Sequence, residues 1–294
     1  MATFKAYPNG VTMGHGNPQP VGGPRGEVVG WSAGAVRRHK RWLYSVVAPK
    51  LTGHGYAYTL TLRHTPATNA AWTTAMVRFL DRLRKVDGVI RWHWVVEWQR
   101  RGTPHVHMAV YGEADAFVPH VLIAWLGAMS EFDPAGIGQL VTPITGPVGW
   151  LKYLSKHASR GVAHYQRQGK PDGWKKTGRL WGKGGSWPVE LPIEGAVNRT
   201  EFARIRRLIR GYLVADAVSR GDVRAAVYLR GMLHCNDRNL SSVRGISEWV
   251  PPEVFMRMLE ASTDSEARTG DLVTQRPQKS PRASLRPRDR TFRS

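Results

Sequence analysis

The sequence predicts an α+β fold, in which helices cover one face of an antiparallel sheet and a helical segment follows at the C-terminal end. From about residue 58 onward, period-two and helical patterns alternate in the order strand, helix, strand, strand, helix, strand, helix. A short polar stretch separates the two central strands, which is typical of a hairpin. Helices packed on one face of an antiparallel sheet suit that order and leave the other face free for a site.

The first elements have clear local signals. Ser32 is placed to cap a short basic helix that runs to Val46. Residues 58–62, Tyr-Thr-Leu-Thr-Leu, alternate in character and favour a strand. From residue 70 to 86 the apolar side chains recur at helical spacing, and Gly88 follows as a stop signal.

A hairpin and three further elements complete the order. Residues 89–97 and 105–111 are strand-like, and the polar residues 99–103 connect them. Pro147 is tolerated in a first helical turn, so a helix is expected to open there. Another helix, at 118–129, and a short strand at 140–141 lie between the hairpin and that proline.

The chain divides into regions by composition and pattern. Glycine and proline dominate the N-terminal end and predict a loosely ordered arm, whereas the C-terminal end is polar and basic and predicts a disordered tail. The predicted regions are a flexible arm at 1–30, the main domain at 31–190, a helical region at 191–262 with helices at 200–234 and 246–262, and the tail at 263–294.

Charge indicates the class of partner. The 294 residues contain 43 Lys and Arg against 22 Asp and Glu, a net charge of +21. Such a surplus attracts polyanions and favours nucleic acid over the alternatives of a ribosomal-type or membrane-surface protein. The single cysteine, Cys235, excludes a disulfide framework and a zinc site of paired cysteines. No apolar run is long enough for a membrane span, and the N-terminal end lacks the apolar core of a signal peptide, so a cytoplasmic location is expected.

Two histidines in the second hairpin strand are candidate metal ligands. Residues two apart on a strand share a face, so His105 and His107 project together while Val106 points the other way. Glu97, at the end of the preceding strand, folds back beside them. Two imidazoles and one carboxylate, with positions left for water and phosphate oxygens, suit Mg²⁺ or Mn²⁺ acting on a phosphodiester. Surface histidines and a salt bridge from Glu97 to Arg100 or Arg101 are the plainer interpretation.

A tyrosine on the helix that is expected to open at Pro147 is the candidate nucleophile. Residues i, i+3 and i+4 share a helix face, so Tyr153, Lys156 and His157 point together. A phenol ionises only near about pH 10, so it needs a cation to help it react, and Lys156 is suitably placed. Alone, a tyrosine in an amphipathic helix is more often a packing residue.

A stretch rich in Gly, Trp and Lys/Arg follows the helix that opens at Pro147, and it runs from Trp174 to Trp187. Aromatic side chains interleaved with cations suit stacking on bases and holding phosphates. An ordinary loop with its tryptophans packed down fits the same composition, and both interpretations remain open.

Taken in order, Glu97, the His105-Val106-His107 triplet and the Tyr153-to-Lys156 pattern resemble the HUH endonucleases. Within that superfamily the chain is most similar to rolling-circle replication initiators of filamentous phages and small plasmids. Three segments carry the closer likeness: residues 31–41, residues 97–105 and residues 178–182. The resemblance covers about residues 30–190 and implies a ferredoxin- or RRM-like core.

The resemblance also implies roles for individual residues. His105, His107 and Glu97 would hold the metal, and Tyr153 would attack single-stranded origin DNA to leave a 5′-phosphotyrosine link and a free 3′-OH. Lys156 would orient or neutralise the phosphate. Some relatives carry a second tyrosine on this helix, where this chain has His157, so a one-tyrosine enzyme is expected.

The sequence has no Gly-x4-Gly-Lys-Ser/Thr phosphate loop, so unwinding and synthesis would fall to a host helicase and polymerase. A one-tyrosine transposase or a mobilisation relaxase would share the same chemistry. A non-catalytic, basic nucleic-acid-binding protein is the alternative from a different class, and it leaves the ordered Glu, His-x-His and Tyr/Lys elements unexplained.

Overall fold

The computed structural model describes residues 1–15, 28–159, 166, 169–233 and 245–273. Its main body is a five-stranded antiparallel sheet with the strand order β6-β3-β5-β4-β7. These strands are β3 (His54–Leu60), β4 (Val89–Trp98), β5 (Pro104–Gly112), β6 (Leu140–Pro143) and β7 (Trp181–Gly185). The predicted α+β class with an antiparallel sheet is therefore confirmed.

The predicted hairpin is β4–β5, in the middle of this sheet. The amide of Gln99 donates to the carbonyl of Thr103 over 2.9 Å and closes the connection. Gly102 has a φ of 80°, a conformation that glycine adopts without steric cost, so the turn depends on it. The hairpin fixes the register in which Glu97 lies opposite His105.

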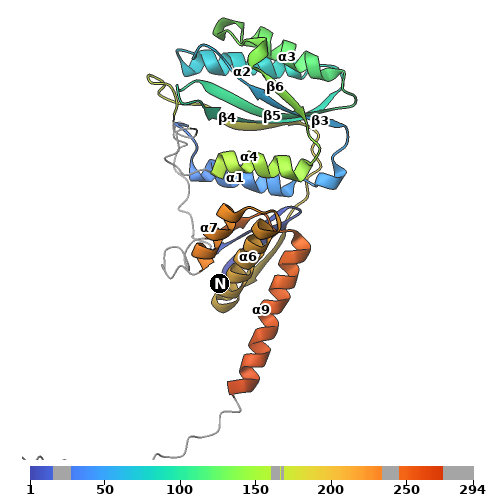
Figure 1. The fold of residues 1–294 in the computed structure, drawn as a ribbon, viewed down its shortest axis with the longest axis vertical. Coiled ribbons are helices and arrows are strands. Elements are labelled where there is room, and N and C mark those ends of the chain that lie inside the picture. The colour runs from blue at the N-terminus through green and yellow to red at the C-terminus, as the bar shows by residue number, and fades with distance from the viewer. Residues whose placement is uncertain (16–27, 160–165, 167–168, 234–244, 274–294) are drawn as a thin grey trace, which may run out of the picture.

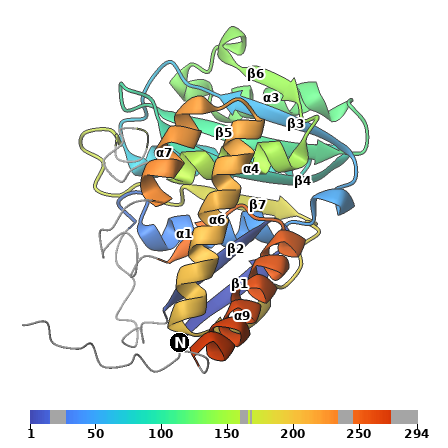
Figure 2. The same cartoon turned by 60° about the horizontal axis from the view of Figure 1, so that its bottom comes forward.

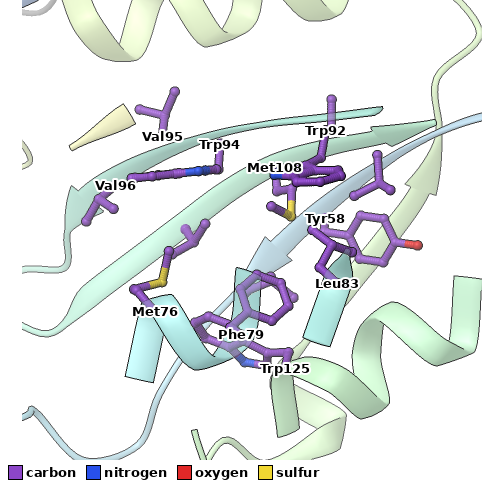
Figure 3. Packing of buried hydrophobic residues seen from close by; sticks show 14 of the residues in the cluster. Tyr58, Met76, Phe79, Leu83, Trp92, Trp94, Val95, Val96, Met108 and Trp125 are labelled. Carbon is purple, nitrogen blue, oxygen red and sulfur yellow. The ribbon is translucent and has the colours of Figure 1, made fainter. Parts of the chain in front are cut away.

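Helices α2 (Asn69–Leu83) and α3 (Phe117–Ala128) cover one face of the sheet (Figure 1). Met76 and Phe79 of α2 and Trp125 of α3 are buried there against Trp94 and Met108 of the sheet (Figure 3). Because side chains alternate across a strand, this face takes one alternate set of the residues of β4 and β5 and leaves the other set to the opposite face.

The opposite face is covered by two further helices, α1 (Ala33–Ser45) and α4 (Pro147–Ser159), which lie side by side (Figure 1). Helices thus lie on both faces, whereas the sequence predicted helices on one face only. The difference arises because Leu43 of α1 and Leu151 and Leu154 of α4 are fully buried in the same core cluster. Ser32 caps α1 as predicted, and its hydroxyl accepts from the amide of Ala35.

A second, four-stranded antiparallel sheet has the order β8-β1-β2-β9. It joins strands from the first fifteen residues to strands that lie beyond residue 190. Its strands are β1 (Ala2–Tyr7), β2 (Gly10–His15), β8 (Ile193–Val197) and β9 (Ile246–Glu248). Helices α6 (Arg199–Ser219) and α9 (Pro252–Val273) lie beside β1 and β2 (Figure 2), and Phe4 meets Phe255 with ring centroids 5.3 Å apart.

This sheet corrects the expectation of a flexible arm at 1–30, because residues 2–15 form a β-hairpin. Ala2, Phe4, Val11 and Met13 of the hairpin are buried in a second apolar cluster with residues of α6 and α9. A six-residue alternation is a weak signal beside so many glycines and prolines, which explains the error. Residues 16–27 of the predicted arm lie outside the described residues.

The C-terminal region is helical as predicted, with differences at its boundaries. The expected helix at 200–234 is two helices, α6 and α7 (Val223–Leu233). The expected helix at 246–262 begins as strand β9 and continues as α9, which runs to Val273 and so includes the first residues of the predicted tail. The rest of that tail lies outside the described residues. None of the described helices is both long and apolar enough to cross a membrane.

Candidate metal and nucleophile site

The hairpin places three predicted site residues on one patch of the sheet. Glu97 lies directly opposite His105, and Val95 lies opposite His107. Val106, between the two histidines, is fully buried in the core, so both imidazoles occupy the face that α1 and α4 cover. Glu97 is 1% exposed and His107 is 5% exposed, which makes this an unusually polar point in a buried sheet.

His107 is in polar contact through both ring nitrogens. Its Nε2 lies 3.5 Å from Oε2 of Glu97, and its Nδ1 lies 3.3 Å from Oγ1 of Thr59, which is its partner residue on β3. If Nδ1 carries the proton and donates to the Thr59 hydroxyl, the Nε2 lone pair faces the carboxylate side. Metal-binding histidines are commonly oriented by such a bond from their second nitrogen.

Two more contacts complete the surroundings. The ring of His105 meets the ring of His107 edge-on, with centroids 4.5 Å apart. Nε2 of Gln166 donates to Oε2 of Glu97 over 3.2 Å. The amide of Gln166 and the imidazole of His107 therefore both contact the same carboxylate oxygen of Glu97, Oε2.

The donor set suits a divalent ion, although the three side chains do not yet converge. In the part of the chain that the structure describes, no group of three His, Cys, Asp or Glu side chains is arranged to hold an ion as it stands. Two ligand atoms at about 2.1 Å from one ion lie about 3.0 to 3.4 Å apart. The 3.5 Å between His107 and Glu97 is close to that spacing, and His105 is their immediate neighbour.

Tyr153 approaches the same patch from α4. Its ring meets that of His107 edge-to-face, with centroids 5.8 Å apart and an interplanar angle of 87°. The helix is anchored by Leu151 and Leu154, which are buried, while Tyr153 itself is 39% exposed. The structure thus brings Tyr153 together with Glu97, His105 and His107.

Lys156 is one turn further along α4 in the backbone. Its side chain and that of His157 lie outside the described residues, so their predicted place beside Tyr153 stays a prediction. The ring of Trp150, one turn before Tyr153, stacks on the Tyr153 ring at 5.1 Å and 27°.

His93 lies apart from this patch, although it shares the strand phase of Glu97. It is fully buried, and its Nε2 is 3.0 Å from Nε2 of His39 on α1. Burial lowers the pKa of His93 well below the ordinary value, and the nearby charges of His39 and Lys183 lower it further. His93 is therefore a packed, neutral histidine.

The aromatic and basic stretch at 174–187 follows the plainer of its two interpretations. Trp174 and Trp187 are buried, and their indole nitrogens donate to the carbonyls of Pro66 and Trp92. Residues 181–185 form the edge strand β7 beside β4. These two tryptophans are core residues and are not available to stack on bases, whereas Lys175 is exposed at the surface.

Three residues of the site were missed from the sequence: Thr59, Trp150 and Gln166. Thr59 lies in the predicted first strand, but only the pairing register shows that it faces His107. Trp150 lies on the same helical stripe as Tyr153, three residues away, and this spacing was a usable signal. Gln166 has no local pattern that marks it.

Comparisons with known proteins agree with one another. Residues 55–158, which include β4, β5 and all but one residue each of β3 and α4, match the family model of the ORF2-type replication-associated protein. No solved structure matches the chain.

Curated relatives extend the similarity well beyond those residues. The chain is 39% identical over 269 residues to a replication-associated protein of Pseudomonas phage Pf3. The match covers 88% of this chain and 96% of that protein. A second relative, from Xylella fastidiosa strain 9a5c, bears the name of a replication protein. It is 44% identical to this chain over 250 residues, and the match covers 82% of this chain and 88% of that protein. With similarity of this extent, the chain belongs to the ORF2-type family of phage replication-associated proteins.

Proposed function

We propose that this protein is a rolling-circle replication initiator of the HUH endonuclease type, which nicks and rejoins single-stranded origin DNA through a 5′-phosphotyrosine link at Tyr153. The observation that carries the proposal is the contact between the rings of Tyr153 and His107 at 5.8 Å. It sets a solvent-accessible phenol beside a buried imidazole and carboxylate. Membership of the ORF2-type family favours replication over transposition or plasmid mobilisation as the context.

His105, His107 and Glu97 would hold a Mg²⁺ or Mn²⁺ ion. When bound, such an ion polarises a phosphate oxygen and offsets the charge that develops on the phosphoryl group. Thr59 orients His107 through Nδ1, and Gln166 orients Glu97 through Oε2. Both contacts come from outside the three ligands and fix the side chains in advance of binding.

In the proposed reaction, the phenol oxygen of Tyr153 attacks the scissile phosphorus. A tyrosine O–P bond forms and the bond from phosphorus to the 3′ oxygen breaks. The phenol loses a proton and the leaving 3′ oxygen gains one, so the step is balanced in atoms and charge. The new link preserves the phosphodiester, so the attack of a 3′-OH on it rejoins the strand with no nucleotide cofactor. Lys156 is proposed to steady the phosphate.

The proposed enzyme uses one tyrosine, so ending a round of replication would require a second subunit or another acceptor. Unwinding and synthesis are proposed to depend on a host helicase and polymerase. The net charge of +21 supports binding to the DNA backbone, and this electrostatic contribution to the affinity weakens as the salt concentration rises.

The decisive test is covalent capture. We expect the full chain, mixed with a single-stranded oligonucleotide from its replicon's origin and Mn²⁺, to form an adduct that survives denaturing electrophoresis. Tyr153→Phe removes only the phenol oxygen, so it should abolish the adduct and leave oligonucleotide binding intact. EDTA should abolish the adduct formed by the wild type.

Tyr228 offers a matched control, because it is 68% exposed on α7, far from the patch in sequence. Tyr228→Phe should form the adduct at the wild-type rate. An adduct that persists in Tyr153→Phe would falsify the nucleophile assignment. A wild-type protein that binds the oligonucleotide and never forms an adduct would instead favour the non-catalytic nucleic-acid-binding alternative.

A further inference from the structure

We infer that Trp150 is a positioning residue, which holds the Tyr153 ring in the orientation that meets His107. The inference rests on the proposed role of Tyr153 as nucleophile. It concerns how a tyrosine on an exposed helix surface is kept aimed at one point of the sheet.

The geometry shows a layered arrangement of three rings. Trp150 and Tyr153 are nearly parallel, with centroids 5.1 Å apart and an angle of 27° between planes. Tyr153 then meets His107 at 87°, edge to face. Since residues i and i+3 lie on one helix face, the stack forms between two residues of α4.

Trp150 is well anchored by its surroundings. It packs against the main core cluster, and its Nε1 atom is buried with no hydrogen-bond partner among the described residues. The indole nitrogens of Trp42, Trp98 and Trp125 are buried in the same way, so packing, and not a hydrogen bond, is what holds Trp150 in place. What the indole does offer is a flat, fixed surface for the Tyr153 ring.

Such a surface matters because a helical tyrosine populates two χ1 rotamers. Tyr153 is 39% exposed, so solvent admits both, but a ring turned away from His107 cannot attack a phosphate held at the patch. Stacking of aromatic rings is strong enough to shift such an equilibrium by about twofold to tenfold. Trp150 therefore raises the fraction of molecules in which the Tyr153 ring faces His107 and can react.

A tryptophan beside a nucleic-acid site could also stack on a base, and the two roles have different kinetic signatures. A positioning residue changes the single-turnover rate at saturating DNA and leaves the dissociation constant unchanged. A base-stacking residue weakens binding, because it contributes contact to the bound strand itself.

The test compares Trp150→Phe, which keeps an aromatic face, with Trp150→Leu, which keeps apolar bulk without one. Adduct formation is measured in single turnover at saturating oligonucleotide with Mn²⁺, and oligonucleotide binding is measured separately in EDTA. We expect Trp150→Leu to form the adduct about twofold to tenfold more slowly at unchanged affinity, and Trp150→Phe to recover most of the rate. Thermal unfolding of both variants verifies that each is folded.

Equal rates in Trp150→Leu and the wild type would overturn the inference, as would a loss confined to the dissociation constant. A slow rate shared equally by both variants would also overturn it, since an aromatic face would then not be the property that counts. All of these outcomes require an active wild type, so they are distinct from a failure of the proposed function, in which the wild type itself forms no adduct.

Discussion

Two pairs of histidines lie at the face of the five-stranded sheet that α1 and α4 cover. One pair lies among polar groups beside an exposed ring, and the other is enclosed by aromatic side chains. His105 and His107 stand on one strand, next to the Glu97 carboxylate and the exposed Tyr153 ring. His107 is held through both nitrogens by groups from neighbouring strands.

The second pair, His39 and His93, is enclosed. Both rings are fully buried and stacked, with their Nε2 atoms 3.0 Å apart, and the rings of Trp42 and Trp181 pack around them. One imidazole donates to the other, so the pair meets part of its own hydrogen-bonding need. Closeness of two imidazoles is thus a packing solution as readily as a metal site, and the buried Glu97 carboxylate together with the exposed Tyr153 ring is what distinguishes the first pair.

The largest expected effect separates the two pairs by function. Replacing both His105 and His107 with Ala should abolish adduct formation, because two of the three proposed ligands are removed. Salt-sensitive oligonucleotide binding should remain, since cationic side chains supply that term. Gel assays of the adduct and fluorescence anisotropy of binding measure the two quantities.

His93→Gln is the control from the enclosed pair, and it should form the adduct at the wild-type rate while the protein stays folded. Undiminished nicking in the His105/His107 double variant would remove the metal site from the mechanism.

A smaller effect should come from the Thr59 hydroxyl. Thr59→Val keeps the shape of the side chain and removes the contact to Nδ1 of His107, so the affinity for Mn²⁺ should fall about tenfold to a hundredfold. Calorimetric titration of Mn²⁺ into DNA-free protein measures this without catalysis. Thr59→Ser should retain the affinity, and a Val variant that binds Mn²⁺ as tightly as the wild type would exclude the orienting role.

The smallest effect concerns pH and the enclosed pair. The pKa of His93 is lowered well below the ordinary value by burial first, and then by His39 and Lys183. The unfolded chain therefore binds a proton below about pH 6.5 that the folded protein does not, and this costs at most about 1.4 kcal/mol of unfolding free energy per pH unit. Stability should fall as pH decreases through that window.

Urea unfolding at several pH values from about 7.5 to about 5.5, which bracket the ordinary histidine pKa, measures this contribution. His93→Gln lacks the titrating group, so the stability difference between wild type and variant should shrink as pH falls. Parallel pH profiles for the two proteins would show that His93 does not titrate in this window.

The core elements of the main domain could be predicted from the sequence because each has a strong periodic signal of its own. The strand at 58–62, the hairpin and the Pro147 helix all lie within a few residues of β3, β4–β5 and α4. Glu97, His105 and His107 could be placed together for the same reason, since two alternations and one short turn determine which side chains share a face. Tyr153 lies on a helix, and only the resemblance to the HUH endonucleases placed it beside them.

The remainder depends on pairings between distant parts of the chain. Strand β7 lies in a stretch whose tryptophans and lysines favoured a loop, and it becomes a strand only because β4 offers it an edge. The roles of Thr59 and Trp150 depend on a register and on a side-chain orientation, neither of which a local pattern encodes.

The position of the first hairpin has a consequence for biosynthesis. Strands β1 and β2 leave the ribosome long before their partners β8 and β9, which begin at Ile193 and Ile246. At about 5 to 20 residues per second, the hairpin waits on the order of ten to fifty seconds for the second of these strands. The domain that carries Tyr153 can fold during that interval, with the nascent hairpin still awaiting its sheet. Premature termination before residue 246 would leave the edge of β2 uncovered, and such products are expected to aggregate or to be degraded.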